Sequence, residues 1–296
     1  MGSDAGHVPV LLDEVLELLA VRPGGLWVDG TVGLGGHAAA LLRATAPDGR
    51  LLGLDRDTDT LERARAVLGP VSDRARLEPG DYREIPERLG DERADGIVLD
   101  LGISSAQLDD PERGFSFQAD GPLDMRIDRS DGETAADVVN RLPEKALADL
   151  IYAYGEERAS RRIARAIVQA RERAPIRTTA ELAEIVRRAA PRGPRRRLHP
   201  ATRTFQALRI HVNRELDGLS EALERIAGCL APSGRMAVIA FHSLEDRAVK
   251  TTFRGLAHRG FALLTKKPVR PSEAETRQNP RARSARLRAL AREEAA

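Results

Sequence analysis

The chain has 296 residues, of which 42% are hydrophobic, and this is enough for one large α/β domain that carries a second domain as an insertion. Its single cysteine, Cys229, excludes an intramolecular disulfide and fits a reducing compartment. No apolar run reaches the ~18–20 residues that cross a bilayer, and the N-terminus lacks the basic-then-apolar pattern of a signal peptide. These features predict a soluble cytoplasmic protein without a membrane partner.

The formal net charge of +2 hides an uneven distribution of charge along the chain. Residues 1–104 carry 11 basic and 19 acidic side chains, a net charge of −8. Residues 187–214 carry nine arginines and no acid, and residues 254–296 carry 11 basic and 4 acidic side chains, a net charge of +7. Two basic segments beside an acidic body are typical of a protein that binds a polyanion, although a solvated arginine-rich surface would give the same pattern.

The first hundred residues alternate short apolar runs with helical patterns. Such alternation predicts βαβ units and a parallel sheet with right-handed crossovers. An N-cap at Asp57 or Thr58 opens one of the helices. The expected helices cover residues 11–20 and 58–68, and the expected strands lie in GLWVDG (25–30), RLLGLD (50–55), ARLEPGDY (75–82) and ADGIVLDLG (94–102).

From residue 107 to residue 204 the apolar residues recur at helical spacing instead. We therefore predict a doubly wound, Rossmann-like sheet domain formed by residues 1–105 and 206–296, with a helical domain inserted at 106–205. The α/β pattern resumes with a helix over 215–229, a strand in GRMAVIAFHS (234–243), a helix over 244–256, and terminal strands in FALLTKK (261–267) and SARLRALAR (284–292).

The motif VDGTVGLGGHA, residues 28–38, follows a predicted strand and opens a helix. Its glycines let the backbone turn sharply and approach a ligand closely, and the helix start offers free N–H groups. Asp55 ends the next strand, twenty residues after Gly35, where a carboxylate can accept both hydroxyls of a ribose. The motif predicts a site for an adenosine-containing cofactor.

The glycine spacing also satisfies the dinucleotide fingerprint, so NAD stays open as an alternative cofactor. Three features favour S-adenosylmethionine. Asp29 stands directly before the glycines, where it suits a ligand with an ammonium group and suits a pyrophosphate badly. The polar and aromatic motif GDY (80–82) follows the third strand, and Asp100 ends the fourth at the edge where ligands bind.

Long strings along the chain are distinctive: HVPVLLDEVLELL, DGTVGLGGH, VLDLGISSAQLDDPERGFSFQADGPLDMRID, LHPATRTFQALRIHVNREL, AFHSLEDRAVK and NPRARSARLRA. In these strings the chain resembles the ribosomal RNA small-subunit methyltransferase H family (MraW-type), whose members methylate the exocyclic N4 amine of a cytosine in 16S rRNA. The resemblance implies a class I methyltransferase fold and S-adenosylmethionine as methyl donor. It also implies an assembled or nearly assembled small subunit as substrate, with the target near the decoding centre.

The same resemblance implies the residues that contact the cofactor. Asp55 would contact the ribose and Tyr82 the adenine, and Asp100 and Gln107 would contact the cofactor from around the loop after the fourth strand. The full set is Gly35, Gly36, His37, Asp55, Tyr82, Asp100 and Gln107.

A cytosine amine is a poor nucleophile because its lone pair is delocalised into the ring. An acceptor for its N–H groups would draw the nitrogen toward a reactive geometry, and Asp100 is the candidate for this catalytic role. Many amine methyltransferases have an acid or amide, two prolines and an aromatic residue here, but this chain has Asp-Leu-Gly-Ile at 100–103. The sequence therefore does not identify the ring that stacks on the target base. Phe115, Phe117 and Phe241 are candidates, but each could equally be a core residue.

Methylation of a cytosine carbon would require a cysteine nucleophile. Cys229 lies late in a predicted helix without an acid or base motif around it, so we interpret it as a small core residue, which favours amine chemistry. The six histidines show no ligand spacing, and the sequence predicts no metal site.

Candidate substrate contacts come from two stretches. His242 in AFHSLEDRAVK follows the fifth predicted strand at the ligand edge, although Ser243 with Asp246 also reads as a helix capping box. The densest basic stretch supplies candidate phosphate contacts. These are Arg195, Arg196, Arg197, Arg203 and Arg209.

Two other classes of function remain open on these residues alone. An NAD-dependent oxidoreductase with a helical substrate domain would explain the glycine loop and leave the arginines unexplained. A non-enzymatic RNA-binding module would explain the arginines and leave the glycine loop with Asp55 unexplained. The oligomeric state is not determined by the sequence, and a homodimer is one option.

Overall fold

The structure is a computed structural model that describes residues 9–191 and 199–294. Its contacts divide the chain into two compact units. One unit combines residues up to Gly102 with those from Gly218 onward, and the other runs from Ile103 to Asp217. In the described residues no helix is both long and apolar enough to cross a membrane.

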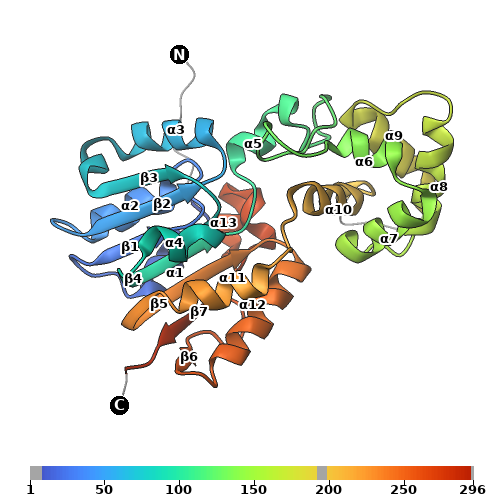
Figure 1. The fold of residues 1–296 in the computed structure, drawn as a ribbon. Helices are drawn as coiled ribbons and strands as arrows, with labels where there is room; N and C mark the ends of the chain where they lie inside the picture. The colour runs from blue at the N-terminus through green and yellow to red at the C-terminus, as the bar shows by residue number, and fades with distance from the viewer. Residues whose placement is uncertain (1–8, 192–198, 295–296) are drawn as a thin grey trace. The chain divides into compact units, whose positions relative to one another are not determined.

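The first unit contains a seven-stranded sheet with the strand order β3-β2-β1-β4-β5-β7-β6 (Figure 1). Strands β1 to β5 are all parallel to one another. Strand β7 lies between β5 and β6 and is antiparallel to both. The predicted doubly wound, Rossmann-like sheet is thus confirmed. The strands are β1 (Leu26–Asp29), β2 (Arg50–Asp55), β3 (Ala75–Pro79), β4 (Ala94–Asp100), β5 (Leu230–Ala240), β6 (Phe261–Leu263) and β7 (Arg286–Arg292).

The strand order reverses between β1 and β4, because the chain first builds outward through β2 and β3 and then returns to the other side of β1. Ligands of open α/β sheets bind at the carboxyl ends of the strands at such a switch point. Asp29 ends β1 and Asp100 ends β4, so both aspartates lie at this place. The sheet topology therefore brings together two acidic residues that are 71 positions apart in the sequence.

Helices accompany the sheet as its alternating sequence predicted. Residues of α1, α2 and α3 share one apolar core with residues of the sheet, among them Leu41, Leu61 and Ile239. Figure 1 shows α4, α11 and α12 in front of the sheet. The helices of this unit are α1 (Leu12–Leu19), α2 (Gly36–Ala44), α3 (Thr58–Leu68), α4 (Ile85–Leu89), α11 (Leu219–Ala227), α12 (Ser243–Leu256) and α13 (Glu273–Gln278), with 3-10 turns η1 (Gly69–Arg74), η2 (Tyr82–Glu84) and η4 (Pro280–Ser284).

The second unit is helical and has its own apolar core, which includes Val138, Ile151, Ile163 and Leu182. A core of this kind lets a unit of about a hundred residues bury its helix faces without the sheet. Its elements are α5 (Ser105–Asp109), η3 (Pro111–Arg113), α6 (Ala135–Arg141), α7 (Glu144–Gly155), α8 (Ser160–Arg171), α9 (Thr179–Ala189) and α10 (Thr202–Asn213).

The boundaries between the units differ from those predicted from the sequence. Residues 103–105 and 206–217 are predicted in the sheet domain, but they belong to the helical unit, and the larger difference is at α10. The reason is that α10 packs against α7 and buries Phe205 and Leu208 in the helical core. Helical periodicity shows which residues of α10 are buried, but it does not show which core receives them.

Candidate functional site

The glycine loop turns the chain from β1 into α2 at the carboxyl edge of the sheet. Gly35 caps α2 with a positive φ of 83°, which a residue with a side chain adopts only with strain. A Cβ atom at Gly35 would lie 3.2 Å from the Cβ of Ala64, and one at Gly36 would lie 2.4 Å from Cγ of Pro9. The loop therefore presents backbone rather than side chains at this edge.

Asp55, the last residue of β2, holds this loop from the neighbouring strand. Its Oδ2 accepts a hydrogen bond from the Gly33 N–H at 2.8 Å, and its Oδ1 accepts one from the Asp57 N–H at 2.9 Å. Burial raises the pKa of Asp55 above its ordinary value. Each carboxylate oxygen can accept a second donor, so the hydroxyls of a ribose can bind without displacing the loop.

Asp29, the last residue of β1, is almost fully buried, with 1% of its surface exposed. Its Oδ1 accepts a hydrogen bond from the Thr31 N–H at 3.1 Å, whereas its Oδ2 is buried without a hydrogen bond in the described part of the chain. Burial, together with the negative charges of Asp100 and Asp55, raises the pKa of Asp29 to about 7. A ligand with an ammonium group would supply the missing donor and offset the clustered negative charge.

Asp100 ends β4 beside Asp29. Its backbone N–H donates to Oγ1 of Thr31 at 2.6 Å, so the threonine ties β4 to the turn after β1. Burial raises the pKa of Asp100 to about 7, and the negative charge of Glu245 contributes to the rise. At neutral pH this carboxyl group can therefore both hold and release a proton. Thr31 is not among the residues predicted from the sequence, although its position inside the glycine motif was the available signal.

Tyr82 lies just beyond β3, at the start of η2. The turn is held by a capping box in which Asp81 and Glu84 exchange hydrogen bonds with each other's backbone. The guanidinium of Arg83 lies 4.7 Å from the centre of the Tyr82 ring. A Cβ atom at Gly30 would come within 3.0 Å of the Cβ of Tyr82, so the tyrosine is adjacent to the turn after β1. The contact of the Tyr82 ring with the adenine stays a prediction.

His37 and Gln107, the other two predicted cofactor contacts, both have structural roles. His37 is buried in the first turn of α2, and its Nε2 lies 3.1 Å from the Val10 carbonyl oxygen. Gln107 caps α5: its Oε1 accepts from the Ser104 N–H at 3.0 Å, and its own N–H donates to Ser104 Oγ at 3.2 Å. Gln107 belongs to the helical unit, whereas the other cofactor candidates belong to the sheet unit.

The predicted substrate arginines fall into three groups. Arg195, Arg196 and Arg197 lie outside the described residues. Arg203 is half exposed, and its Nη1 donates to the Glu156 carbonyl oxygen at 3.1 Å. Arg209 is mostly buried and forms two hydrogen bonds of 2.9 Å with the carboxylate of Glu215. A phosphate would have to displace this carboxylate, so the geometry of Arg209 indicates an internal ion pair rather than an RNA contact.

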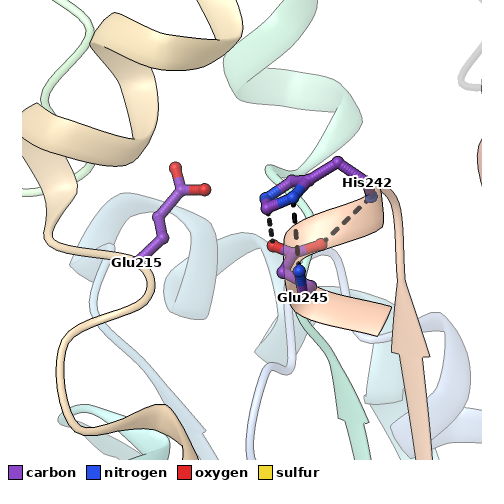
Figure 2. Close-up of side chains that lie close together, drawn as sticks. All are labelled: Glu215, His242 and Glu245. Atoms are coloured by element: carbon purple, nitrogen blue, oxygen red, sulfur yellow. Dashed lines mark hydrogen bonds and ion pairs between the residues drawn. The ribbon is translucent and has the colours of Figure 1, made fainter. Parts of the chain in front are cut away.

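His242 and Glu245 form a buried pair at the start of α12, which Figure 2 shows with the imidazole ring beside the carboxylate. The Glu245 N–H donates to Nδ1 of His242 at 3.3 Å, and Nε2 lies 3.1 Å from Oε1 of Glu245. Oε2 of Glu245 accepts from the Phe241 and His242 N–H groups at 2.9 and 3.3 Å. Because Nδ1 accepts the Glu245 N–H, a proton on the imidazole ring would be on Nε2.

The capping box predicted from Ser243 and Asp246 is therefore wrong by one residue, because His242 and Glu245 occupy the two capping positions. Asp246 instead accepts a hydrogen bond of 2.7 Å from Nε of Arg288 in β7. The two patterns are one step apart in the sequence, and only the long-range partner Arg288 distinguishes them. His242 is 6% exposed, so its observed role is to cap and position α12.

The three candidate stacking rings differ in their surroundings. Phe115 is buried in the helical core, and the Phe117 ring packs against Phe205 with ring centres 4.8 Å apart. Phe241 is partly buried and directly follows β5 at the carboxyl edge, where a Cβ atom at Gly102 would come within 2.8 Å of its ring. Of the three rings, Phe241 is the one that directly follows the strand next to Asp100.

Cys229 connects α11 to β5 and is 6% exposed. Its Sγ donates to the Arg225 carbonyl oxygen at 3.5 Å, and burial raises the pKa of the thiol above its ordinary value. A reactive cysteine needs the opposite shift, toward the thiolate. The interpretation of Cys229 as a small core residue agrees with this environment.

Comparisons with known proteins point to one family. The sequence matches the family described as the MraW methylase family over residues 4–293. It is 53% identical to the ribosomal RNA small subunit methyltransferase H of Syntrophotalea carbinolica, with 97% of this chain and 98% of that protein covered. It is 51% identical to the protein of the same name from Syntrophobacter fumaroxidans, with 98% of this chain and 97% of that protein covered.

Proposed function

This chain belongs to the MraW methylase family, and from that premise we propose that it transfers a methyl group from S-adenosylmethionine to the N4 amine of a cytosine in 16S rRNA. The observation that carries the proposal is the cluster of Asp29, Asp55 and Asp100 at the carboxyl ends of three adjacent strands. The cluster suits a ligand that is positively charged and carries a ribose. The family relatives named as small-subunit rRNA methyltransferases supply the substrate class.

The residues at this edge fit S-adenosylmethionine better than a dinucleotide. The buried Oδ2 of Asp29 would accept the ammonium group, and Asp55 would accept the ribose hydroxyls. The Tyr82 ring would contact the adenine. A pyrophosphate in place of the ammonium would meet the carboxylate of Asp29, and the like charges would repel. When bound, the cofactor supplies an electrophilic methyl group.

Asp100 has the position and the protonation behaviour for the chemical step. Its carboxylate would accept a hydrogen bond from the cytosine N4–H group and orient the nitrogen toward the methyl carbon. A nitrogen–carbon bond then forms while the sulfur–carbon bond breaks, and the amine must lose one proton. With its pKa near 7, Asp100 can accept that proton at neutral pH.

The substrate proposal extends to the small ribosomal subunit, assembled or nearly assembled, with the target near its decoding centre. The net charge of +7 over residues 254–296 supports a polyanionic partner. Arg203 at the surface of the helical unit supports a role for that unit in binding rRNA, and a helical surface suits recognition by shape. This activity would place the protein in the cytoplasm with the ribosome.

The identity of the methylated atom tests the proposed function. The wild-type protein should produce N4-methylcytidine in 16S rRNA, and it should act on small subunits faster than on naked 16S rRNA. Cys229→Ser should retain most of the activity, because the thiol is buried and protonated. The measurement is mass spectrometry of nucleosides after digestion of the rRNA. Production of 5-methylcytidine, or complete inactivity of a folded Cys229→Ser protein, would contradict amine chemistry.

Removal of the ribose acceptor tests the cofactor site. Asp55→Ala should weaken S-adenosylmethionine binding by about 1–3 kcal/mol, roughly 5- to 150-fold, because charge-assisted hydrogen bonds are lost. Calorimetric titration measures the affinity. Asp59→Ala is the matched control, since Asp59 is an exposed acid four residues away and should leave the affinity unchanged. Equal affinities of the Asp55→Ala and Asp59→Ala proteins, or tight binding of NAD by the wild type, would refute the assignment.

A further inference from the structure

The exposed side of α8 in the helical unit carries a dense positive charge. Residues 158–173 contain six arginines and one acid, a net charge of +5. The apolar residues of the helix, Ile163, Ala164 and Ile167, are buried in the core of the unit. Helical spacing then turns the residues between them toward solvent. The exposed arginines of this side and of the turn before the helix, which we call the α8 arginine face, are Arg158, Arg161, Arg162 and Arg165.

The α8 arginine face has few partners within the protein. The guanidinium groups of Arg158 and Arg161 form no hydrogen bond or ion pair within the described residues. Nη2 of Arg162 donates to a backbone carbonyl oxygen at 3.2 Å, and Nε of Arg165 lies 3.4 Å from a carboxylate oxygen of Glu144. Residues 192–198, which the structure does not describe, contain no acid that could neutralise the remaining charges.

This arrangement of charge is unfavourable for the helix itself. Arg158 and Arg161 are three residues apart and Arg161 and Arg165 are four apart, so like charges are neighbours on the helix surface. The first turn of α8 contains no acid, and Arg161 and Arg162 therefore oppose the positive end of the helix dipole. A bound anion would offset both effects.

The neighbouring helix α9 shows a different arrangement of exposed arginines in the same unit. Its Arg187 and Arg188 lie three and four residues after Glu184, and each forms an ion pair of 2.6 Å with that carboxylate. An acid, Glu181, also lies in the first turn of α9. The positive charge of α9 is thus balanced within the helix, whereas most of the charge on α8 is available to an external partner.

A row of anions fits the α8 arginine face better than a single ion does, because the arginines extend over more than one helical turn of about 5.4 Å. A nucleic acid backbone supplies such a row, and arginine binds its phosphates through paired N–H groups. We infer that the α8 arginine face binds backbone phosphates of the rRNA substrate. This inference rests on the proposed function and adds a contact surface outside the basic segments 187–214 and 254–296.

The test replaces the two arginines that have no partner. The Arg158→Gln, Arg161→Gln double variant should raise KM for unmodified small subunits about tenfold and lower the slope of log affinity against log salt by about two phosphate contacts. Its kcat and its S-adenosylmethionine affinity should match the wild type, because no proposed cofactor or catalytic residue lies on α8. Steady-state kinetics give KM and kcat, and binding to 16S rRNA at several salt concentrations gives the slope.

Two further variants show whether charge at this place is the cause. The Arg158→Lys, Arg161→Lys protein keeps both charges and should keep the wild-type salt slope. The Arg22→Gln, Arg50→Gln protein is the matched control, because it removes the same charge from two exposed arginines that form ion pairs at the amino edge of the sheet. This control should leave KM and the salt slope unchanged.

The outcomes separate the inference from the proposed function. If the wild type forms no N4-methylcytidine, the proposed function itself fails. If the wild type is active but the Arg158→Gln, Arg161→Gln protein keeps the wild-type KM and salt slope, only the role of the α8 arginine face is refuted. Equal losses in the control variant would refute it too. Weaker binding to small subunits without weaker binding to 16S rRNA would also refute it, and would indicate a ribosomal protein as the partner of this face.

Discussion

Replacing Asp100 by asparagine should lower the rate of methyl transfer by about 100- to 10,000-fold, the usual range for loss of a positioned proton acceptor. Asparagine has nearly the same shape and can still accept a hydrogen bond from the cytosine amine, but it cannot take the proton. Single-turnover rates on small subunits measure the chemical step. A rate within threefold of the wild type would contradict the catalytic role of Asp100.

The pH dependence of the rate provides a second measurement of the same role. The carboxylate is the form that accepts the proton, and burial raises the pKa of Asp100 to about 7. The wild-type rate should therefore rise as the pH increases through about 7 and become constant above it. Asp29 has a pKa near the same value, so Asp29→Asn is the control that should retain this rise. An Asp100→Asn protein with the wild-type pH profile would contradict the assignment.

Asp29→Asn should increase the stability of the free protein while weakening cofactor binding. Because burial raises the pKa of Asp29 from 3.8 to about 7, the folded state binds more protons than the unfolded state between these values. The carboxyl group therefore reduces stability progressively as the pH rises from about 4 to about 7. Asparagine removes this penalty, which is on the order of a few kcal/mol because each pKa unit corresponds to about 1.4 kcal/mol.

The two effects of Asp29→Asn separate in the measurements. Thermal unfolding should show a larger gain in melting temperature at pH 8 than at pH 5. Calorimetry should show roughly 10- to 150-fold weaker binding of S-adenosylmethionine, because the ammonium loses a charged acceptor worth about 1.5–3 kcal/mol. The exposed Asp59→Asn serves as the control for both experiments. A variant with unchanged cofactor affinity would refute the proposed ammonium contact.

The sequence by itself determined the sheet unit and the residues at its ligand edge. Its strands and helices follow from local periodicity, and the alternation of the two element types requires parallel strands with crossover helices. Parallel strands end at the same edge, so the positions of Asp29, Asp55 and Asp100 at the ends of apolar runs predict that they lie at one edge of the sheet, as they do. The glycine loop was recognisable for the same reason, because its spacing has a direct backbone consequence.

Only the tertiary structure decided which partners the polar side chains take. Glu245 rather than Asp246 completes the cap of α12 because Arg288, 42 residues later, takes the Asp246 carboxylate. The same strand register leaves Nη1 of Arg286 buried without a hydrogen bond in the described residues. Arg209, which was predicted to contact RNA, instead forms an ion pair with Glu215.

The pKa values of the acids at the site also depend on the tertiary structure. The pKa values near 7 of Asp29 and Asp100 arise from burial at the junction of β1 and β4 and from acids on other strands and helices. Burial depends on how the whole chain packs, whereas periodicity reports only on a residue and its near neighbours. The sequence therefore located the acids, and the packing of distant segments set the charge that they carry.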